Sequence, residues 1–234
     1  MSKEIKNLED KVIVVTGATG GVGPTVVSRL IESGAEVLGI YRSEGKLERA
    51  KERGEDMARA SYYQADLIEE AAVEELSTKI EEEYEKISGI VNLVGGFATG
   101  SIATTKGEDM VTVFKRQTLT VFFTLKYLGD LLEEGGSVIN FSSTRALDSD
   151  SGSLAYNVGK SALNSLTKSV DNEAKMRKVR INALAPGIMD TPNNREAMPN
   201  SDRSDWTSLE EVADVVEFLL SPKSSSISGQ IIRI

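Results

Sequence analysis

Short apolar runs alternate with longer amphipathic segments from end to end of this chain of 234 residues. Apolar runs of this kind, rich in Val and Ile, are typical of strands that are buried on both faces of a parallel sheet. The amphipathic segments between them are typical of crossover helices. The pattern therefore predicts an α/β fold with a doubly wound parallel sheet and helices on both faces, formed by one domain over residues 1–234.

The expected elements follow from this periodicity. We expect strands at residues 12–15, 36–41, 61–64, 90–94, 137–141, 179–185 and 230–234. We expect helices at residues 22–33, 44–53, 69–86, 108–132, 154–176 and 210–220, with a Ser/Asp-rich loop after the fifth strand. Residues 186–206 carry three Pro and three Asn without apolar periodicity, which predicts a long loop. We expect this loop, at about 186–208, to act as a lid over the site.

Composition excludes several classes of function. The chain has 27 Lys and Arg against 36 Asp and Glu, a net charge of −9, which disfavours nucleic acid and anionic membranes as partners. It has no Cys and no His, so thiolate and imidazole metal sites, disulfides and His-activated nucleophiles are absent. The charged N-terminus has no apolar signal-peptide core. We therefore expect a cytoplasmic protein that holds no metal and whose acid–base chemistry uses Tyr, Lys, Asp or Glu.

A glycine-rich run directly follows the first expected strand and opens the first expected helix. It reads Thr16-Gly17-Ala18-Thr19-Gly20-Gly21-Val22-Gly23. Glycines allow a tight turn and a close approach of backbone to a pyrophosphate, and the free N–H groups of a helix start favour its negative charge. In this strand–turn–helix context, the run predicts a dinucleotide-binding turn.

Tyr156 and Lys160 lie at positions i and i+4 of an expected helix. This spacing places both side chains on one face, one turn apart. A nearby ammonium favours the phenolate and pulls the pKa of a Tyr down from about 10. The pair is therefore a candidate acid–base group, although its spacing also suits an ordinary surface helix.

Together, these motifs resemble the short-chain dehydrogenase/reductase family. The resemblance extends over nearly the whole chain. It rests on the ordered motifs Thr16-Gly17…Gly21-Val22-Gly23, Asp66-Leu67, Tyr156…Lys160, Pro186-Gly187 and Ser228-Gly229-Gln230. The resemblance implies a Rossmann-type fold, a nicotinamide cofactor, and hydride transfer between a carbonyl and an alcohol of a small molecule.

The resemblance also implies roles for individual residues. Tyr156 would be the proton donor, and Lys160 would tune Tyr156 and hold the nicotinamide ribose. Ser143, at the family's usual separation before the Tyr, would steady the developing oxyanion, although physics alone leaves the adjacent Ser142 open. The residues expected at the cofactor are Gly17, Thr19, Gly20, Gly21, Val22, Gly23, Arg42, Asp66, Leu67, Val94, Gly95, Tyr156, Lys160, Pro186, Gly187, Ile188 and Thr191.

Two positions depart from the family pattern. The family's Asn-Asn-Ala-Gly run after the fourth strand is Asn92-Leu93-Val94-Gly95-Gly96 here. Many members carry an Asn on the long central helix that supports a water-mediated proton relay to the Lys, and here that position is read as Thr118. Whether Thr118 preserves the relay is left open.

The end of the second expected strand bears on the choice of cofactor. A carboxylate there would accept hydrogen bonds from the ribose hydroxyls of NAD and repel the additional phosphate of NADP. The chain instead has Tyr41-Arg42-Ser43, and Arg42 is able to pair with that phosphate. We therefore expect NADP, with NAD as the alternative.

The leading hypothesis is an NADP(H)-dependent carbonyl reductase or alcohol dehydrogenase. The loops at residues 94–97 and 190–207 resemble those of the dihydropteridine reductase branch, which makes such a reductase one alternative. A 3-oxoacyl-thioester reductase is another, and a dinucleotide-binding regulatory protein is the alternative outside enzymes. The resemblance implies a homo-oligomer, most plausibly a homotetramer. Apolar residues on more than one face of segment 111–125 agree with it.

Overall fold

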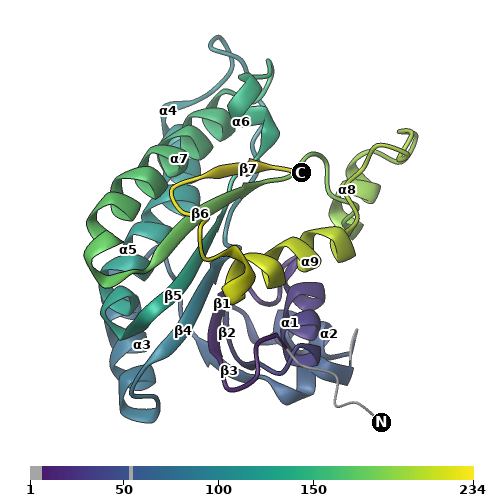
Figure 1. Ribbon diagram of the computed structural model, residues 1–234. Coiled ribbons are helices and arrows are strands. Elements are labelled where there is room, and N and C mark those ends of the chain that lie inside the picture. The colour runs from purple at the N-terminus through teal and green to yellow at the C-terminus, as the bar shows by residue number, and fades with distance from the viewer. Residues whose placement is uncertain (1–6, 53–54) are drawn as a thin grey trace.

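A parallel sheet of seven strands forms the centre of the computed structural model, which describes residues 7–52 and 55–234 (Figure 1). Its order is β3-β2-β1-β4-β5-β6-β7, and every neighbouring pair is parallel. The strands are β1 (Val12–Thr16), β2 (Glu36–Tyr41), β3 (Ser61–Gln64), β4 (Ile87–Asn92), β5 (Leu132–Phe141), β6 (Arg180–Ala185) and β7 (Ile231–Arg233). The predicted doubly wound α/β architecture is confirmed.

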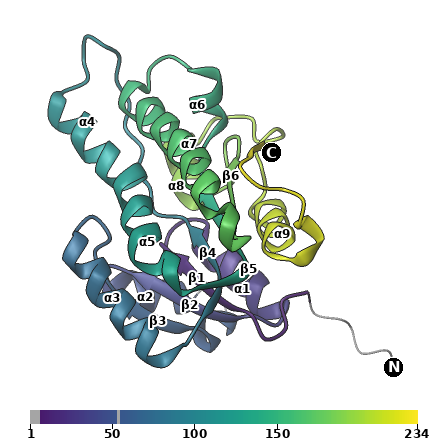
Figure 2. The same cartoon turned by 60° about the vertical axis from the view of Figure 1, so that its left-hand side comes forward.

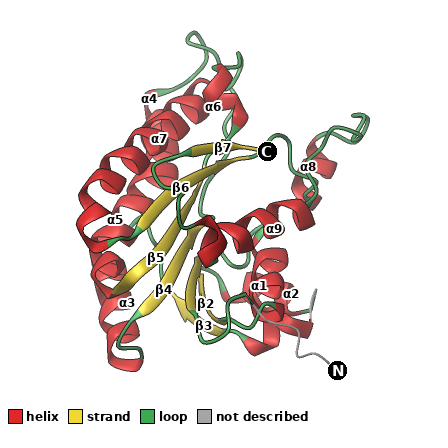
Figure 3. Ribbon diagram, viewed as in Figure 1, coloured by secondary structure: helices red, strands yellow, loops and turns green. Residues whose placement is uncertain are grey.

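Helices cover both faces of the sheet (Figures 2 and 3). One face carries α1 (Gly23–Glu32), α2 (Glu44–Lys51) and α9 (Leu209–Leu220). The other carries α3 (Glu70–Glu83), α4 (Gly107–Phe114), α5 (Thr120–Leu128) and α7 (Leu154–Ala174). Two short helices, α6 (Thr144–Asp148) and α8 (Pro192–Ala197), lie in loops. Short 3₁₀ turns occupy Glu55–Arg59, Gly129–Leu131, Lys175–Arg177 and Pro222–Ser224.

Each face of the sheet has its own apolar core. On one face, Val26 and Leu30 of α1 pack with Val216 of α9. On the other, Leu76 and Ile80 of α3 belong to the second core cluster. Because both faces are covered, the central strands are buried and mainly apolar, as expected for a parallel sheet, with a few buried polar residues such as Asn92, Asn140 and Asn182.

Three sequence expectations need correction. The helix expected at 108–132 is interrupted between α4 and α5 by a π-helical turn, Lys115–Leu119. Apolar residues on more than one face of this segment hide the change of phase that such a turn introduces. The loop after β5 contains α6, whose first turn is capped by Ser143. The loop at 186–206 contains α8, whose first turn is capped by Thr191 and begins with Pro192. Both helices are too short to show an apolar stripe.

The strand order reverses between β1 and β4, because the chain builds outward first to β3 and then in the other direction. In such sheets, ligands bind beyond the carboxyl ends of the strands on either side of this switch point. Here the loops after β1 and β4 touch, since a Cβ on Gly17 would lie 3.1 Å from the backbone N of Val94.

Candidate active site

The turn between β1 and α1 is shaped by glycine. Gly17 adopts φ +66°, in the left-handed region, and a Cβ on Gly23 would overlap the carbonyl oxygen of Ala18. Helix α1 has no side-chain cap and no acidic residue in its first turn. Its first amide groups are therefore open to an anion, and the turn fits the pyrophosphate of a dinucleotide.

The ends of β2 and β3 lie side by side and bring Arg42 to Asp66. The Arg42 guanidinium lies 3.8 Å from an Asp66 carboxylate oxygen, and the two side chains are 56% and 37% exposed. The Tyr41 hydroxyl donates a hydrogen bond to the Glu44 carboxylate at 2.7 Å, so Glu44 pairs with Tyr41 rather than with Arg42. Leu67 is buried next to Asp66. Among the described residues, the ion pair of Arg42 is long and exposed, so it holds the guanidinium weakly.

Ser143 and Tyr156 meet at the carboxyl end of β5. Ser143 is buried and caps α6, its hydroxyl accepting a hydrogen bond from the Arg145 amide at 3.3 Å. Burial raises the pKa of Tyr156 above its ordinary value, while hydrogen bonding to Ser143 and the charge of Arg145 act to lower it. Ser142 is also buried, but its hydroxyl has no hydrogen-bond partner in the described part of the chain. The structure therefore brings Ser143, and not Ser142, into contact with the phenol.

Lys160 lies in the same cluster, one turn along α7 from Tyr156. Its ammonium is buried and donates to the carbonyl oxygen of Phe141, and burial lowers its pKa to about 8. A Cβ on Gly95 would lie 3.6 Å from Lys160 Nζ, so Lys160 also reaches the loop after β4. The expected lowering of the Tyr156 pKa by Lys160 is wrong, because the burial of Tyr156 outweighs the effects that lower its pKa, and Arg145 is the charge that acts on it.

The π-helical turn packs two polar side chains against this cluster. Thr118 donates from Oγ1 to the Gly159 carbonyl oxygen at 3.0 Å. Gln117 is fully buried and donates from Nε2 to the Gly96 carbonyl oxygen at 2.7 Å. Within the described residues its Oε1 has no partner. Sequence analysis considered Thr118 and missed Gln117, for which a polar residue inside an apolar helix was the available signal.

The segment after β6 approaches the glycine-rich turn. The Pro186 carbonyl accepts from the Thr144 amide at 3.1 Å, and the Gly187 amide donates to the Ile234 carbonyl at 3.0 Å. Thr191 is buried, and its side chain would lie 3.3 Å from a Cβ on Gly21. The expected cofactor residues of β1, β4 and β6 are therefore gathered around one region, at the carboxyl ends of these strands.

Two further side chains lie beside Tyr156. The ring of Phe97 stands edge-on to the Tyr156 ring, with centroids 5.0 Å apart. The Arg145 guanidinium lies over the Phe97 ring, 5.9 Å from its centroid. Sequence analysis gave Arg145 no role, because only the folded chain brings α6 and the loop after β4 together.

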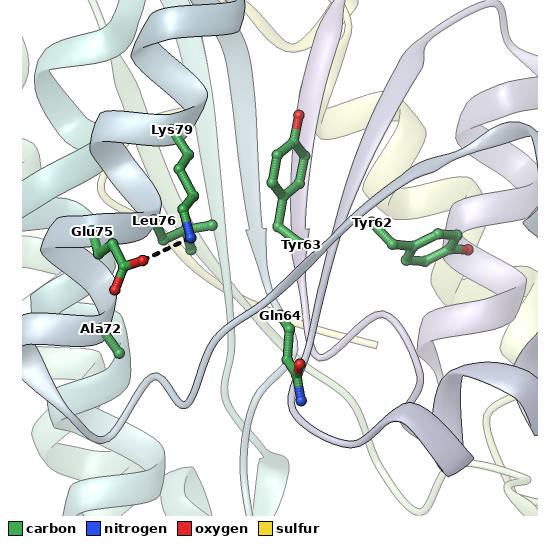
Figure 4. A pocket seen from close by; sticks show the side chains of 7 residues that line it. All are labelled: Tyr62, Tyr63, Gln64, Ala72, Glu75, Leu76 and Lys79. Atoms are coloured by element: carbon green, nitrogen blue, oxygen red, sulfur yellow. Dashed lines mark hydrogen bonds and ion pairs between the residues drawn. The ribbon is translucent and has the colours of Figure 1, made fainter.

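A cavity of about 330 Å³ lies away from this cluster, along the edge strand β3 and helix α3 (Figure 4). Lys79 and Glu75 form an ion pair on its α3 side, at 2.7 Å, while Tyr62 points away from Tyr63. A second hollow of about 550 Å³ lies between residues 204–207 and α9. Neither contains Ser143, Tyr156 or Lys160.

A family model described as Enoyl-(Acyl carrier protein) reductase matches residues 17–234. This chain belongs to the short-chain dehydrogenase/reductase family. As a member, it is an NAD(P)(H)-dependent oxidoreductase that interconverts a carbonyl and an alcohol by hydride transfer. The family membership and the class of reaction predicted from the sequence are confirmed.

Individual relatives agree with this assignment. The chain is 28% identical to the 3-oxoacyl-acyl-carrier-protein reductase of Thermotoga maritima, over 97% of each protein. It is 31% identical to an oxidoreductase of Staphylococcus saprophyticus described as uncharacterized, over 79% of this chain and 81% of the relative. A solved short-chain type dehydrogenase/reductase of Mycobacterium ulcerans superposes with a TM-score of 0.90 at 25% identity, covering 97% of this chain and 89% of that one.

The described residues contain neither a membrane-spanning helix nor a metal-binding cluster. Over residues 7–52 and 55–234, no helix of this short-chain dehydrogenase/reductase is long and apolar enough to cross a membrane. Over the same residues, no group of three or more acidic side chains is placed to hold a metal ion.

Proposed function

We propose that this oxidoreductase is an NADP(H)-dependent carbonyl reductase or alcohol dehydrogenase in which Tyr156 transfers a proton to or from the substrate oxygen. The observation that carries the proposal is the meeting of Ser143, Tyr156 and Lys160 at the carboxyl end of β5. Because the chain has no His and no Cys, the Tyr156 phenol is the acid–base group that this cluster offers.

Each member of the cluster has a separate task in this proposal. The Ser143 hydroxyl steadies the negative charge that develops on the substrate oxygen, from a position fixed by the α6 cap. Lys160 is held by the Phe141 carbonyl, is charged below its pKa of about 8, and binds the nicotinamide ribose. The bound nicotinamide supplies or accepts the hydride.

We assign the cofactor contacts to the loops that lie at the carboxyl ends of the strands. The glycine-rich turn binds the pyrophosphate, Asp66 and Leu67 border the adenine, and the segments after β4 and β6 border the nicotinamide. The residues that we assign to cofactor binding are Gly17, Thr19, Gly20, Gly21, Val22, Gly23, Arg42, Asp66, Leu67, Val94, Gly95, Tyr156, Lys160, Pro186, Gly187, Ile188 and Thr191. The positive φ of Gly17 and the uncapped start of α1 support this assignment most directly.

NADP is the proposed cofactor because the Arg42 guanidinium is exposed and only loosely paired. A 2′-phosphate would compete successfully with Asp66, since a phosphate offers a doubly hydrogen-bonded, charge-assisted contact. The carboxylate that would select NAD is absent at Tyr41.

The test is the dissociation constant of each cofactor for the parent and for Arg42→Ala. We expect NADPH binding to weaken by about 10- to 100-fold, the range for loss of a hydrogen bond to a charged group, with little change for NADH. Arg49→Ala is the matched control, because Arg49 is an exposed Arg of α2 that bonds to the Gly45 carbonyl. A parent protein that binds NADH more tightly than NADPH would reject the choice of NADP.

We also propose a homotetramer that acts on a small carbonyl or alcohol substrate in the cytoplasm. Support for self-association comes from Val111, Phe114 and Phe122 of α4 and α5, which are 56%, 37% and 42% exposed. Light scattering at micromolar concentration should give the mass of a tetramer, and the mass of a monomer would contradict the proposal.

A 3-oxoacyl thioester reductase is the second candidate. The described activity of the Thermotoga maritima relative favours it. Reduction of a 3-oxoacyl thioester, compared with that of simple ketones and aldehydes, would separate the two candidates. The dihydropteridine-type alternative stays a prediction.

A further inference from the structure

Arg145 is a cation beside the catalytic cluster, and no carboxylate of the described residues pairs with it. In the part of the chain that the structure describes, its guanidinium donates to the Ser153 hydroxyl at 3.2 Å and has no ion pair. Asp148, on the same helix, is already paired with Arg233 at 2.7 Å. The amide of the exposed Asp150 bonds to the Arg145 carbonyl, while no contact joins its carboxylate to the guanidinium. The guanidinium is therefore free to bind an anion.

Phe97 connects this cation to the reacting phenol. Its ring contacts Arg145 on one side, at 5.9 Å from the guanidinium carbon, and Tyr156 on another, at a centroid distance of 5.0 Å. The ring is also 59% exposed, which is unusual for a Phe that packs on a catalytic group. The Phe97 ring thus forms an apolar surface between the Tyr156 phenol and the Arg145 guanidinium, and this surface is exposed to solvent.

We propose that Arg145 binds a carboxylate of the substrate, so that the enzyme reduces an oxo acid, or oxidises the matching hydroxy acid, whose hydrocarbon part lies on Phe97. This inference deepens the proposed function and rests on it. In reduction, the carbonyl carbon gains a hydride from NADPH, which becomes NADP⁺, and the oxygen gains a proton from Tyr156. The carboxylate is unchanged and serves only to orient the substrate.

Electrostatics supports this class of substrate. The chain carries a net charge of −9 and so repels anions at long range. An anionic substrate therefore needs a local cation, and a guanidinium pairs with a carboxylate through two parallel hydrogen bonds. Arg145 follows Ser143 by two residues, so the same helix start that fixes the oxyanion donor also fixes the carboxylate site.

The test compares 2-, 3- and 4-oxo carboxylic acids with their methyl esters, using NADPH oxidation as the readout. The variants are Arg145→Gln, which removes the charge, and Arg145→Lys, which keeps it. Arg116→Gln is the matched control, because the Arg116 side chain lies near Gly96 of the loop after β4 and its loss changes the net charge equally. Ser153→Ala removes the structural hydrogen bond of Arg145 while leaving its charge.

We expect the parent to prefer at least one acid over its ester. In Arg145→Gln, the ratio of kcat/KM for that acid to kcat/KM for its ester should fall about 10- to 100-fold, because a change in the Tyr156 pKa affects both substrates equally whereas the lost carboxylate contact affects only the acid. Arg145→Lys should retain part of the preference, and Arg116→Gln and Ser153→Ala should retain most of it. A parent that favours the esters, or an equal loss for acid and ester in Arg145→Gln, would overturn the inference.

A binding measurement separates this inference from the proposed function. Saturated carboxylates of the same chain lengths are titrated by calorimetry into the parent and Arg145→Gln, each with NADPH bound. Binding to the parent alone would support the Arg145 assignment even if no test carbonyl were turned over, whereas equal or absent binding would overturn it. Turnover of esters without any preference for acids would leave the reductase function intact and reject only the carboxylate site.

Discussion

The Lys160 ammonium donates a hydrogen bond to the Phe141 carbonyl oxygen, which ties the start of α7 to the end of β5. The ammonium is buried, and burial lowers its pKa from 10.5 to about 8. In the described part of the chain no carboxylate lies within ion-pair distance to offset this burial. The charged form of Lys160 is thus held where a neutral side chain would be more stable.

Replacing Lys160 by Met should therefore raise stability while it abolishes turnover. Below pH 8, Lys160 is charged in both the folded and the unfolded chain, and its burial destabilises the fold by up to about 3 kcal/mol. Between pH 8 and 10.5 the unfolded chain binds more protons, so the stability of the parent rises with pH and the advantage of Lys160→Met shrinks. Urea unfolding at pH 7 and pH 9.5 measures the gain in stability and its decrease with pH, and an activity assay measures turnover. The control Lys168→Met, on the exposed side of α7, should change neither the stability nor its dependence on pH.

The glycine-rich turn should not tolerate a side chain at Gly23. A Cβ there would overlap the Ala18 carbonyl oxygen, so Gly23→Ala must shift the turn and should weaken cofactor binding by at least tenfold. Gly45→Ala is the control, because its Cβ would meet nothing within 4 Å in α2. Ala has the higher helix propensity, so this variant should be more stable by roughly 0.5–1 kcal/mol and should bind cofactor normally. Fluorescence titration with NADPH and thermal unfolding check the pair.

We propose that the segment at about 186–208 is a lid whose moving part is 192–206. Its base is fixed, because the Asp190 amide donates to the Thr207 carbonyl and the Thr207 amide donates to the Ile188 carbonyl, each at 2.9 Å. Thr191 also packs on Gly21. The middle projects from the sheet (Figure 1), with local contacts such as Arg195 with Asp190 and Arg203 over Trp206 at 5.5 Å. Those contacts are few, which is typical of a segment of low local stability.

The lid should close when NADPH and a substrate analogue bind together. Hydrogen exchange across 192–206 should then slow, while the amide of Thr207 should be protected in both states. Emission from Trp206, the single Trp of the chain, should change at the same time. If exchange across 192–206 is equal in the free and ternary states, the segment is a fixed wall.

Sequence periodicity predicted the sheet well, because strands covered on both faces contain continuous apolar runs. The bounds of β2 and β3 agree with the expected 36–41 and 61–64, and most other ends differ by a few residues. Periodicity could not predict the π-helical turn, because apolar residues on more than one face of segment 111–125 hide the change of phase that an added residue introduces. Periodicity also could not predict α6 and α8, which Ser143 and Thr191 cap, because these helices are too short to carry an apolar stripe.

Only the site residues that belong to recognisable sequence motifs could be predicted. Tyr156, Lys160 and Ser143 were assigned because the resemblance carries their spacing. Phe97 and Arg145 were not, because their contact with Tyr156 joins the loop after β4, helix α6 and helix α7, which only the fold brings together. The pKa of Tyr156 could not be predicted for the same reason, since it depends on how deeply the phenol is buried.

The central claim is that the Tyr156 phenol transfers the proton. Turnover and NADPH binding of Tyr156→Phe test it most directly, because this change removes one hydroxyl and leaves the ring packed against Phe97. We predict a loss of kcat of about 100-fold or more, the lower end of the range for general acid catalysis, with a dissociation constant for NADPH within threefold of the parent. Turnover at the parent rate in Tyr156→Phe would contradict the account.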